Sequence, residues 1–480
     1  TGQGIQFQPT TASTATKLSA AQQALLNSPT PPGPSDGAAV VDYLRGERSG
    51  ETAGTYRSRT HLLGDILHAE PLVIREPTNN YGDAGYATGS GNFKTTYAGR
   101  PKLLLQGAND GMLHAFNAAT GAEEWAYVPN LVMGSLNNLS LKNGFTHKYY
   151  VDGTPVSGDV NFSNTDGVSQ KPTPPAPDWH TVVVGGLGKG GRGYYALDVT
   201  QLPGAETDLA GKVLWEFPNT SHAKIAANIG YSFGRPIIVK TRAAGWVVLV
   251  TSGYNNGTNA GDSGGDGKGY LFVLNARTGN LIQAISTGIG STSEPSGLAH
   301  ISGYVESRDA DNTVDYVYGG DLKGNVWRFD LTNASSIGAW NVAALANLVD
   351  SSGNFQPVTT EPELAKIRIT GGTYKRFVYV GTGRYLGDSD IPGSSGANVN
   401  ASQTQTMYGL VDDLSNTPVI APLRSSLQQQ TLTVTDPKTG DRTASANTLD
   451  FSTKKGWYID LPAAGERLDT HPTLAYSALV

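Results

Sequence analysis

A short segment between two predicted strands carries oxygen-bearing side chains at every second position. These residues are Ser307, Asp309, Asp311, Thr313 and Asp315. Oxygen ligands at alternate positions of a tight loop are how one short segment surrounds a hard cation, with a backbone carbonyl and a later carboxylate completing the shell. Three like charges on a short loop also repel one another when nothing binds between them, which favours a bound cation. The spacing therefore predicts a Ca²⁺ site in this loop.

Two alignments of the segment with a calcium-binding loop are possible. In the first, Ser307 is the first ligand and the carbonyl of Thr313 precedes Asp315. In the second, Asp309 is the first ligand. Asp309, Asp311 and Asp315 are ligands in both alignments, and the residues alone leave the choice open.

The surroundings of the segment distinguish it from an EF-hand. Asn312 stands where the first alignment requires a glycine, and asparagine adopts the left-handed conformation more readily than most residues. A strand, not a helix, is expected from Tyr316 onward, and neither alignment reaches the closing glutamate of an EF-hand. The alternative interpretation is a solvated acidic loop closed by Asx turns.

The rest of the sequence offers no convincing catalytic set. The chain has no cysteine, which excludes disulfides, thiolate metal sites and cysteine nucleophiles. No histidine pair has a zinc-binding spacing, and the G-x-S-x-G motif does not occur. Gly186, Gly188 and Gly191 match G-x-G-x-x-G, but a predicted strand follows where dinucleotide binding needs a helix. His114 alternates with core-facing neighbours and is expected to face a neighbouring loop or solvent.

Composition favours an all-β protein with many turns. Of 480 residues, 60 are glycine and only 16 % are charged, and amphipathic helical patterns are few. The net charge is −6, with no basic cluster beyond Arg45–Arg48, so nucleic acid is not an expected partner. No apolar stretch reaches the roughly 18–20 residues that span a bilayer. The chain begins Thr-Gly-Gln without a signal-peptide pattern, which indicates a processed form or an excised piece.

One unit recurs along the chain from about Leu62. Each copy is an apolar strand, a turn rich in Gly, Asp, Asn or Lys, a second apolar strand, and often a Thr-Gly turn into a third. The copies begin near residues 103, 181, 247, 316 and 377, at intervals of 61 to 78 residues. These intervals exceed the roughly 40–45 residues of a compact propeller blade, so the connecting loops contain insertions.

A ring of such units is the predicted architecture. A single blade cannot bury both faces, whereas blades stacked around an axis cover each other and leave only short edges. With weaker units before and after the five clear ones, we predict an all-β propeller of about seven blades over residues 61–480. Residues 1–60 are predicted to form a separate N-terminal segment, with short helices at Lys17–Leu26 and Ala38–Leu44 and a Pro-rich linker over 28–37. A pair of β-sandwiches is the alternative.

Several of these stretches together resemble a known family. They are "VDYLRGERSGE", "RSRTHLLGDILHAEPLVI", "GANDGMLHAFNAATGAEEWAYVP", "DYVYGGDLKGNVWRFDL" and "VGTGRYL". They resemble the C-terminal domain of the PilC/PilY-type proteins of type IV pili, from about Val41 to about Leu461, and Asp309–Leu331 is the most specific part. The resemblance implies a modified β-propeller with a calcium loop on one blade.

The resemblance also implies a ligand set. The family pattern is acidic residues at alternate positions, ending in the Asp before "YVYGGDL". The resemblance therefore implies the first alignment. Its ligands, in chain order, are Ser307, Asp309, Asp311, the Thr313 carbonyl and Asp315. Ser307 departs from the pattern, because the family usually has Asp there, and a hydroxyl lowers the charge of the site.

A second departure concerns Arg45-Gly46-Glu47. The family often has the integrin-binding tripeptide Arg-Gly-Asp at this place, and the glutamate puts the carboxylate one methylene further out. A polar helix end is the expected role of this tripeptide.

The function implied by the resemblance is that of a calcium-binding type IV pilus assembly and adhesion factor. Such a factor opposes pilus retraction and supports twitching motility and surface attachment. Its partners are pilus subunits, either major or minor pilins, and a host or abiotic surface. Its location is exported, on the pilus or fimbrium, at the cell surface or associated with the outer membrane. We expect no enzymatic activity.

Two alternatives remain. Quinoprotein dehydrogenases are also propellers with Ca²⁺ and similar repeats, but their cofactor is commonly held by a Trp floor and a vicinal disulfide. This chain has no cysteine, and its acidic residues belong to one local loop. The other alternative is a calcium-free envelope scaffold with the same fold.

Overall fold

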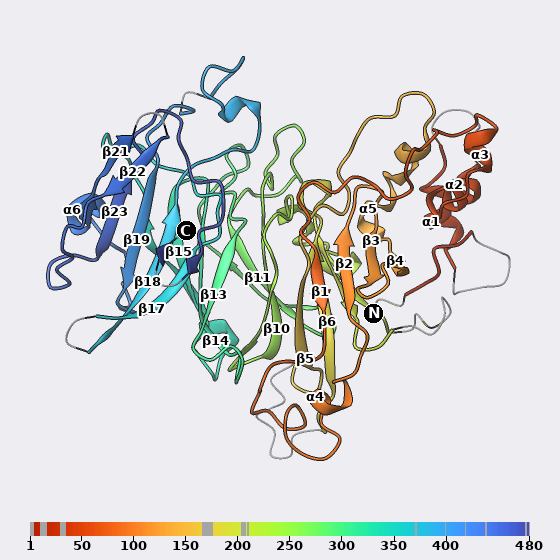
Figure 1. Cartoon of the computed structure of the whole chain (residues 1–480), viewed down its shortest axis with the longest axis horizontal. Coiled ribbons are helices and arrows are strands. Elements are labelled where there is room, and N and C mark those ends of the chain that lie inside the picture. The colour runs from red at the N-terminus through yellow and green to blue at the C-terminus, as the bar shows by residue number, and fades with distance from the viewer. Residues whose placement is uncertain are drawn as a thin grey trace.

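The chain folds into antiparallel β-sheets that follow one another across the molecule (Figure 1). The computed structural model describes residues 4–9, 17–28, 35–165, 176–202, 208, 211–369, 372–398, 400–417, 419–436, 439–475 and 478–479. In Figure 1 the sheets run in chain order from the red N-terminal side to the blue C-terminal side. This all-β architecture confirms the predicted fold class.

Four sheets have four strands each. The first contains β1 (Leu72–Ile74), β2 (Leu103–Gly107), β3 (Leu113–Asn117) and β4 (Glu123–Tyr127). The second contains β5 (Val156–Asn161), β6 (Trp179–Gly186), β7 (Tyr194–Asp198) and β8 (Val213–Phe217). The third contains β9 (Ile237–Thr241), β10 (Gly245–Thr251), β11 (Tyr270–Asn275) and β12 (Leu281–Ser286). The fourth contains β13 (Ile301–Val305), β14 (Val314–Gly320), β15 (Asn325–Asp330) and β16 (Asn341–Asn347).

The C-terminal part forms a larger sheet and two small hairpins. The fifth sheet contains, in spatial order, β17 (Glu363–Arg368), β18 (Tyr374–Gly381), β19 (Thr406–Asp412), β23 (Gly456–Asp460) and β20 (Gln428–Gln430). The pairing of β20 with β23 is parallel. The hairpins are β21 (Leu432–Asp436) with β22 (Asp441–Ala444), and β24 (Leu474–Ala475) with β25 (Ala478–Leu479).

Each repeat found in the sequence corresponds to one sheet, because the predicted starts fall on β2, β6, β10, β14 and β18. The count of about seven blades is not confirmed. The described residues form five sheets of four or five strands. The weak unit before the first repeat supplies only the short strand β1, which completes the first sheet. The weak unit after the fifth supplies β23, which joins the fifth sheet, and the small hairpin of β24 and β25.

The sheets pack face to face through apolar side chains. Every residue of β10 is buried, as expected for a central strand covered on both sides. Val247 and Leu271 of the third sheet share a core cluster with Val317 and Phe329 of the fourth. Such packing between neighbouring sheets is the stacking that a blade needs to bury its faces.

The α-helices of the described residues are short, and half of them lie in residues 1–60. They are α1 (Ala20–Ala24), α2 (Gly37–Leu44), α3 (Ser49–Thr52), α4 (Phe93–Thr96), α5 (Asn130–Met133) and α6 (Leu423–Ser426). Helix α2 confirms the helix predicted at Ala38–Leu44, whereas α1 is shorter than predicted and begins at a capping box formed by Ser19 and Gln22. Most of the predicted Pro-rich linker lies outside the described residues. No helix in the described part of the chain is long and apolar enough to cross a membrane.

The N-terminal helices are attached to the first sheet. Val40, Val41 and Tyr43 of α2 are buried in the same apolar cluster as Leu105 and Leu113. The predicted N-terminal segment, residues 1–60, is thus packed against the predicted propeller domain, residues 61–480. The boundary between them stays a prediction.

Candidate cation-binding loop

The predicted calcium loop joins β13 to β14 and consists of residues 306–313. The carbonyl of Ser307 accepts hydrogen bonds from the amides of Asp311, at 2.9 Å, and Asn312, at 3.1 Å, which closes a tight turn. Asn312 has a φ of 56°, so it adopts the left-handed conformation predicted for it. Its side-chain amide donates to the carbonyl of Ile238 at 3.1 Å and attaches the loop to the third sheet.

Asp315 lies within a strand, not at the end of the loop. The strand was expected from Tyr316, but β14 begins at Val314. Tyr304 pairs with Tyr316 and Val305 pairs with Val314, which leaves Asp315 as the extra residue of a β-bulge. Because a bulge redirects a side chain from the regular alternation of the strand, it fixes where this carboxylate points.

Two of the three predicted carboxylate ligands form ion pairs with the third sheet. Asp311 Oδ1 is 2.7 Å from Lys240 Nζ, and Asp315 Oδ1 is 2.8 Å from an Nη of Arg242. Asp309 is exposed, and among the residues described its carboxylate has no ion pair. Nowhere among the described residues do three Asp, Glu, His or Cys side chains lie together as a group that could hold a metal. The predicted ligands thus share one loop without converging on one point.

The donor chemistry of the loop nonetheless fits calcium. Its candidate donors are all oxygen atoms, as a hard cation requires. Burial opposes ionisation of Asp311, but hydrogen bonds with Lys240 and Thr313 outweigh it and lower the pKa of this carboxyl. Asp311 is therefore ionised, with Lys240 as its cationic partner. The predicted Ca²⁺ site at Ser307, Asp309, Asp311, Thr313 and Asp315 remains a prediction.

An insertion between β1 and β2 also contacts the loop. The amide of Asn80 donates to the carbonyl of Asp309 at 2.7 Å, and the amide of Gly82 donates to the carbonyl of Ala310 at 2.9 Å. Asp83 binds Lys240 Nζ at 2.8 and 3.0 Å. The loop is consequently held between the first, third and fourth sheets.

Sequence reasoning missed Lys240, Arg242 and Asp83. The only local signal was two basic residues, two positions apart, at the end of the strand in "PIIVKTRAAG". Asp83 lies in a loop far from both in the sequence, and only the stacking of the sheets brings it to Lys240. Pattern analysis of one segment could not have found this contact.

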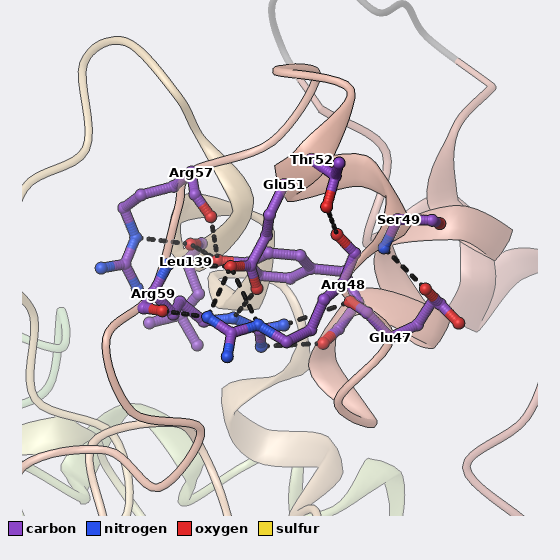
Figure 2. Close-up of polar contacts among 9 residues, drawn as sticks. Glu47, Arg48, Ser49, Glu51, Thr52, Arg57, Arg59 and Leu139 are labelled. Carbon is purple, nitrogen blue, oxygen red and sulfur yellow. Dashed lines mark hydrogen bonds and ion pairs between the residues drawn. The ribbon is translucent and has the colours of Figure 1, made fainter.

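A second charged cluster lies in the N-terminal segment and is of a different kind (Figure 2). Arg59 Nε is 2.7 Å from Glu51 Oε1, and these side chains are 8 % and 5 % exposed. Burial opposes ionisation of Glu51, but the Arg59 amide and the guanidinium groups of Arg59 and Arg48 lower the pKa of its carboxyl to about 2. Arg59 also donates to the carbonyl of Tyr43 at 2.8 Å and lies 3.6 Å over its ring. This cluster joins α2 and α3 to the chain that enters the first sheet.

The tripeptide Arg45-Gly46-Glu47 follows α2 and is largely exposed. Gly46 has a φ of 106°, which a residue with a side chain rarely adopts. The Glu47 carboxylate accepts a hydrogen bond from the Ser49 amide at 2.6 Å (Figure 2). The tripeptide therefore forms the polar end of helix α2, as expected.

His114 is buried and does not face solvent, which was one of the two positions expected for it. It lies on β3 with Nδ1 2.6 Å from Glu123 and Nε2 3.1 Å from Asp110. Burial disfavours the charged imidazolium, but both carboxylates outweigh this and raise the pKa of His114. His114 lines a cavity of about 1240 Å³ together with Trp125 and Tyr127.

The fold and the acidic loop together define a modified β-propeller with a candidate cation-binding hairpin loop. Residues 63–444 match the family model of the PilY1 beta-propeller domain, and this chain belongs to that family. The matched residues contain the first four sheets and the loop at 306–313. Of the fifth sheet they contain every strand but β23.

Curated relatives agree with this assignment. The chain is 32 % identical over 475 residues to the type IV pilus biogenesis factor PilY1 of Pseudomonas aeruginosa strain PAK, an alignment that covers 88 % of this chain and 36 % of that protein. It is 33 % identical over 462 residues to a PilY1 homologue of Xylella fastidiosa, covering 89 % of this chain and 28 % of the homologue. The chain thus spans about a third of the length of the curated relatives it matches.

A solved structure is also similar. The crystal structure of the Pseudomonas aeruginosa PilY1 C-terminal domain matches with a TM-score of 0.60 and 28 % identity, covering 81 % of this chain and 77 % of that chain. A quinohemoprotein alcohol dehydrogenase from Comamonas testosteroni matches with a TM-score of only 0.33 and 12 % identity, covering 64 % of this chain and 40 % of that one. The curated relatives of this chain are named as type IV pilus biogenesis factors.

Proposed function

We propose that this chain is the calcium-binding propeller domain of a type IV pilus assembly and adhesion factor. Membership of the PilY1 propeller family over residues 63–444 is the observation that carries the proposal, and the curated relatives are named as type IV pilus biogenesis factors. The factor acts on the exported side of the cell, on the pilus or at the cell surface. Its partners are pilus subunits and the host or abiotic surface to which the cell attaches.

Calcium is proposed to bind the 306–313 loop and the adjoining bulge. Asp309, Asp311 and Asp315 supply carboxylates, Thr313 its carbonyl, and Ser307 its hydroxyl or a bound water. A bound Ca²⁺ supplies two positive charges that offset these carboxylates. Asn312 supports the proposal because its left-handed conformation closes the loop at the position where a calcium loop needs such a residue.

The loop is proposed to act as a switch on pilus dynamics. In this hypothesis the empty loop permits pilus retraction and the filled loop opposes it, so that twitching motility and surface attachment depend on calcium. The contact of the loop with the first and third sheets supports the idea, since a change in the loop alters contacts between sheets.

We also propose that the domain has no catalytic activity. Family membership favours a role in assembly over one in chemistry. The check is turnover of alcohols or sugars with an artificial electron acceptor after addition of a quinone cofactor. Measurable turnover, or a quinone chromophore in the absorbance spectrum of the purified protein, would show that the proposal is wrong.

A calcium-free scaffold is the second candidate, and one observation favours it. Asp311 and Asp315 already have cationic partners in Lys240 and Arg242, so the loop has a stable arrangement without a metal. Calorimetric titration with Ca²⁺ separates the two candidates.

The cellular test compares surface piliation and twitching in strains that carry the full-length protein. Asp315→Ala removes a ligand and should mimic the empty loop, giving less surface pilus. Asp315→Lys places an ammonium among the remaining carboxylates and should partly mimic the filled loop. Asp413→Ala is the matched control, because Asp413 also forms an ion pair, with Lys455, but lies just after β19 of the fifth sheet.

The proposal predicts that both phenotypes differ from wild type in Asp315→Ala and that Asp413→Ala is unaffected. If Asp315→Ala abolishes calcium binding yet leaves piliation and twitching unchanged, the ion has at most a structural role and does not act as a switch.

A further inference from the structure

The lysine that faces the loop is unusually placed for a surface charge. Lys240 lies on β9 with only 9 % of its side chain exposed, and its Nζ is held between Asp83, at 2.8 Å, and Asp311, at 2.7 Å. The Nζ is also 5.7 Å from the centre of the buried Trp246 ring. A lysine stem buried in this way cannot withdraw far into solvent, so its charge stays next to the loop.

The cations of the third sheet use the same oxygen atoms that a metal would use. Lys240 contacts Asp311 Oδ1, and Arg242 contacts Asp315 Oδ1. A carboxylate oxygen that is paired with an ammonium or guanidinium group is a poorer ligand for a divalent cation, and the two positive charges repel a Ca²⁺ ion placed nearby. Two of the three carboxylates, those of Asp311 and Asp315, are therefore paired with cations of the protein itself.

We infer that Lys240 and Arg242 are internal counter-ions that compete with calcium for the loop and set its affinity. This inference rests on the proposed calcium site. Binding of the metal is then an exchange, in which Asp311 leaves Lys240 and Asp315 leaves Arg242. Lys240 keeps Asp83, so the insertion that carries Asp83 stays attached to the third sheet when the loop is released.

The competition makes the loop a threshold sensor. Without the counter-ions, carboxylates that repel one another would take up calcium at low concentration. With them, calcium must reach a concentration at which it outcompetes two tethered cations. Lys240 should contribute more than Arg242, because the Arg242 side chain is 44 % exposed and its charge is better screened by solvent.

Calorimetric titration of the purified domain with CaCl₂ tests the inference through single substitutions. Lys240→Met keeps the length of the side chain and removes the charge, and it should tighten calcium binding about tenfold or more. Arg242→Gln, which breaks only an exposed ion pair and should not impair folding, should tighten it about threefold. Lys240→Arg keeps the charge and should stay near wild type. Lys323→Met is the matched control, because Lys323 pairs with Glu294 beyond the opposite end of β14.

A second measurement does not depend on calcium. Hydrogen exchange in EGTA reports whether the loop is held without metal. The amides of Asp311 and Asn312 should be protected in wild type and in Lys240→Arg, and should exchange faster in Lys240→Met, because the loop has then lost its side-chain ion pair with the third sheet.

The outcomes separate this inference from the proposed function. If wild type binds calcium and Lys240→Met and Arg242→Gln bind it no more tightly, the inference is overturned and the calcium site stands. If wild type binds no calcium but the Lys240→Met/Arg242→Gln double variant does, the inference is supported and the calcium role of the wild-type domain is lost. If no variant binds calcium and exchange in EGTA is the same in wild type and Lys240→Met, both fail.

Discussion

The molecule contains two clusters in which carboxylates meet cations, and they differ in how completely the protein satisfies them. Glu51 is 5 % exposed and is held by Arg59, by Arg48 and by a backbone amide. Asp311 is 58 % exposed and has one charged partner, Lys240. The first cluster joins successive parts of one segment, whereas the second joins different sheets.

The difference shows which cluster can exchange its partner. A buried pair with all its hydrogen bonds made is costly to break, because breaking it leaves an uncompensated charge in a poorly solvated place. In the pair of Asp311 with Lys240 only the carboxylate is exposed. Water can solvate it when the pair breaks, so another cation can replace Lys240 at smaller cost. The Glu51 cluster is therefore structural, and the 306–313 loop is the part of the molecule suited to reversible binding.

The largest effect is expected from Glu51→Gln. The substitution leaves the Arg59 guanidinium without its anion, and it should lower the free energy of unfolding by about 3–5 kcal/mol. Urea denaturation followed by tryptophan fluorescence measures this change. Lys455→Gln, which breaks an exposed ion pair with Asp413, is the control and should cost less than about 1 kcal/mol. An equally small cost for Glu51→Gln would remove the distinction between the two clusters.

Acid titration sharpens the same contrast. The pKa of Glu51 is lowered from 4.5 to about 2, so the native state favours the ionised carboxylate. Its contribution to stability is fully present above pH 4.5 and is lost as the pH falls through about 2. The difference in unfolding free energy between wild type and Glu51→Gln should therefore shrink between pH 4.5 and 2. A difference that stays constant over this range would contradict the assigned pKa.

Asp315→Ala should separate binding from stability. Loss of a direct ligand should weaken calcium binding by more than about tenfold, since even the loss of a group behind a ligand commonly costs that much. The unfolding free energy in EGTA should fall by no more than about 1 kcal/mol, because its ion pair with Arg242 is partly exposed. Calorimetry and urea denaturation on the same samples give both values. A large loss of stability with unchanged calcium affinity would mean that Asp315 is structural.

The smallest effect is expected from Glu47→Asp, which lies beside the buried cluster but is exposed. The change restores Arg-Gly-Asp and removes one methylene, and it should alter the unfolding free energy by less than about 0.5 kcal/mol. Thermal unfolding of the two proteins measures it. A larger loss would show that the hydrogen bond from Ser49 holds the helix end more firmly than its exposure indicates.

Much of the fold could be predicted because its signal is local and repeated. Apolar strands separated by turns located the second strand of every sheet, from Leu103 to Tyr374, to within a few residues. The number of blades could not be predicted in this way. Whether a short segment such as Leu72–Ile74 starts a new sheet or completes an existing one depends on which neighbour it pairs with, and that is a long-range property.

Of the candidate site, too, only the features that depend on neighbouring residues in the sequence could be predicted. The spacing of the acidic residues and the left-handed Asn312 follow from short-range rules, and Asn312 adopts the predicted conformation. The partners Lys240, Arg242 and Asp83 do not follow from such rules, because they reach the loop from two other sheets. For the same reason the argument from repulsion between the carboxylates was incomplete, since it counted only the charges within one segment.

Calorimetric titration of the purified domain with CaCl₂ tests the central claim most directly. The comparison is between wild type and a variant in which Asp309, Asp311 and Asp315 are all replaced by Ala. The account predicts a single saturable binding transition in wild type and none in the triple variant. Absence of binding in wild type, or the same transition in the triple variant, would contradict the claim that this loop is an exchangeable calcium site.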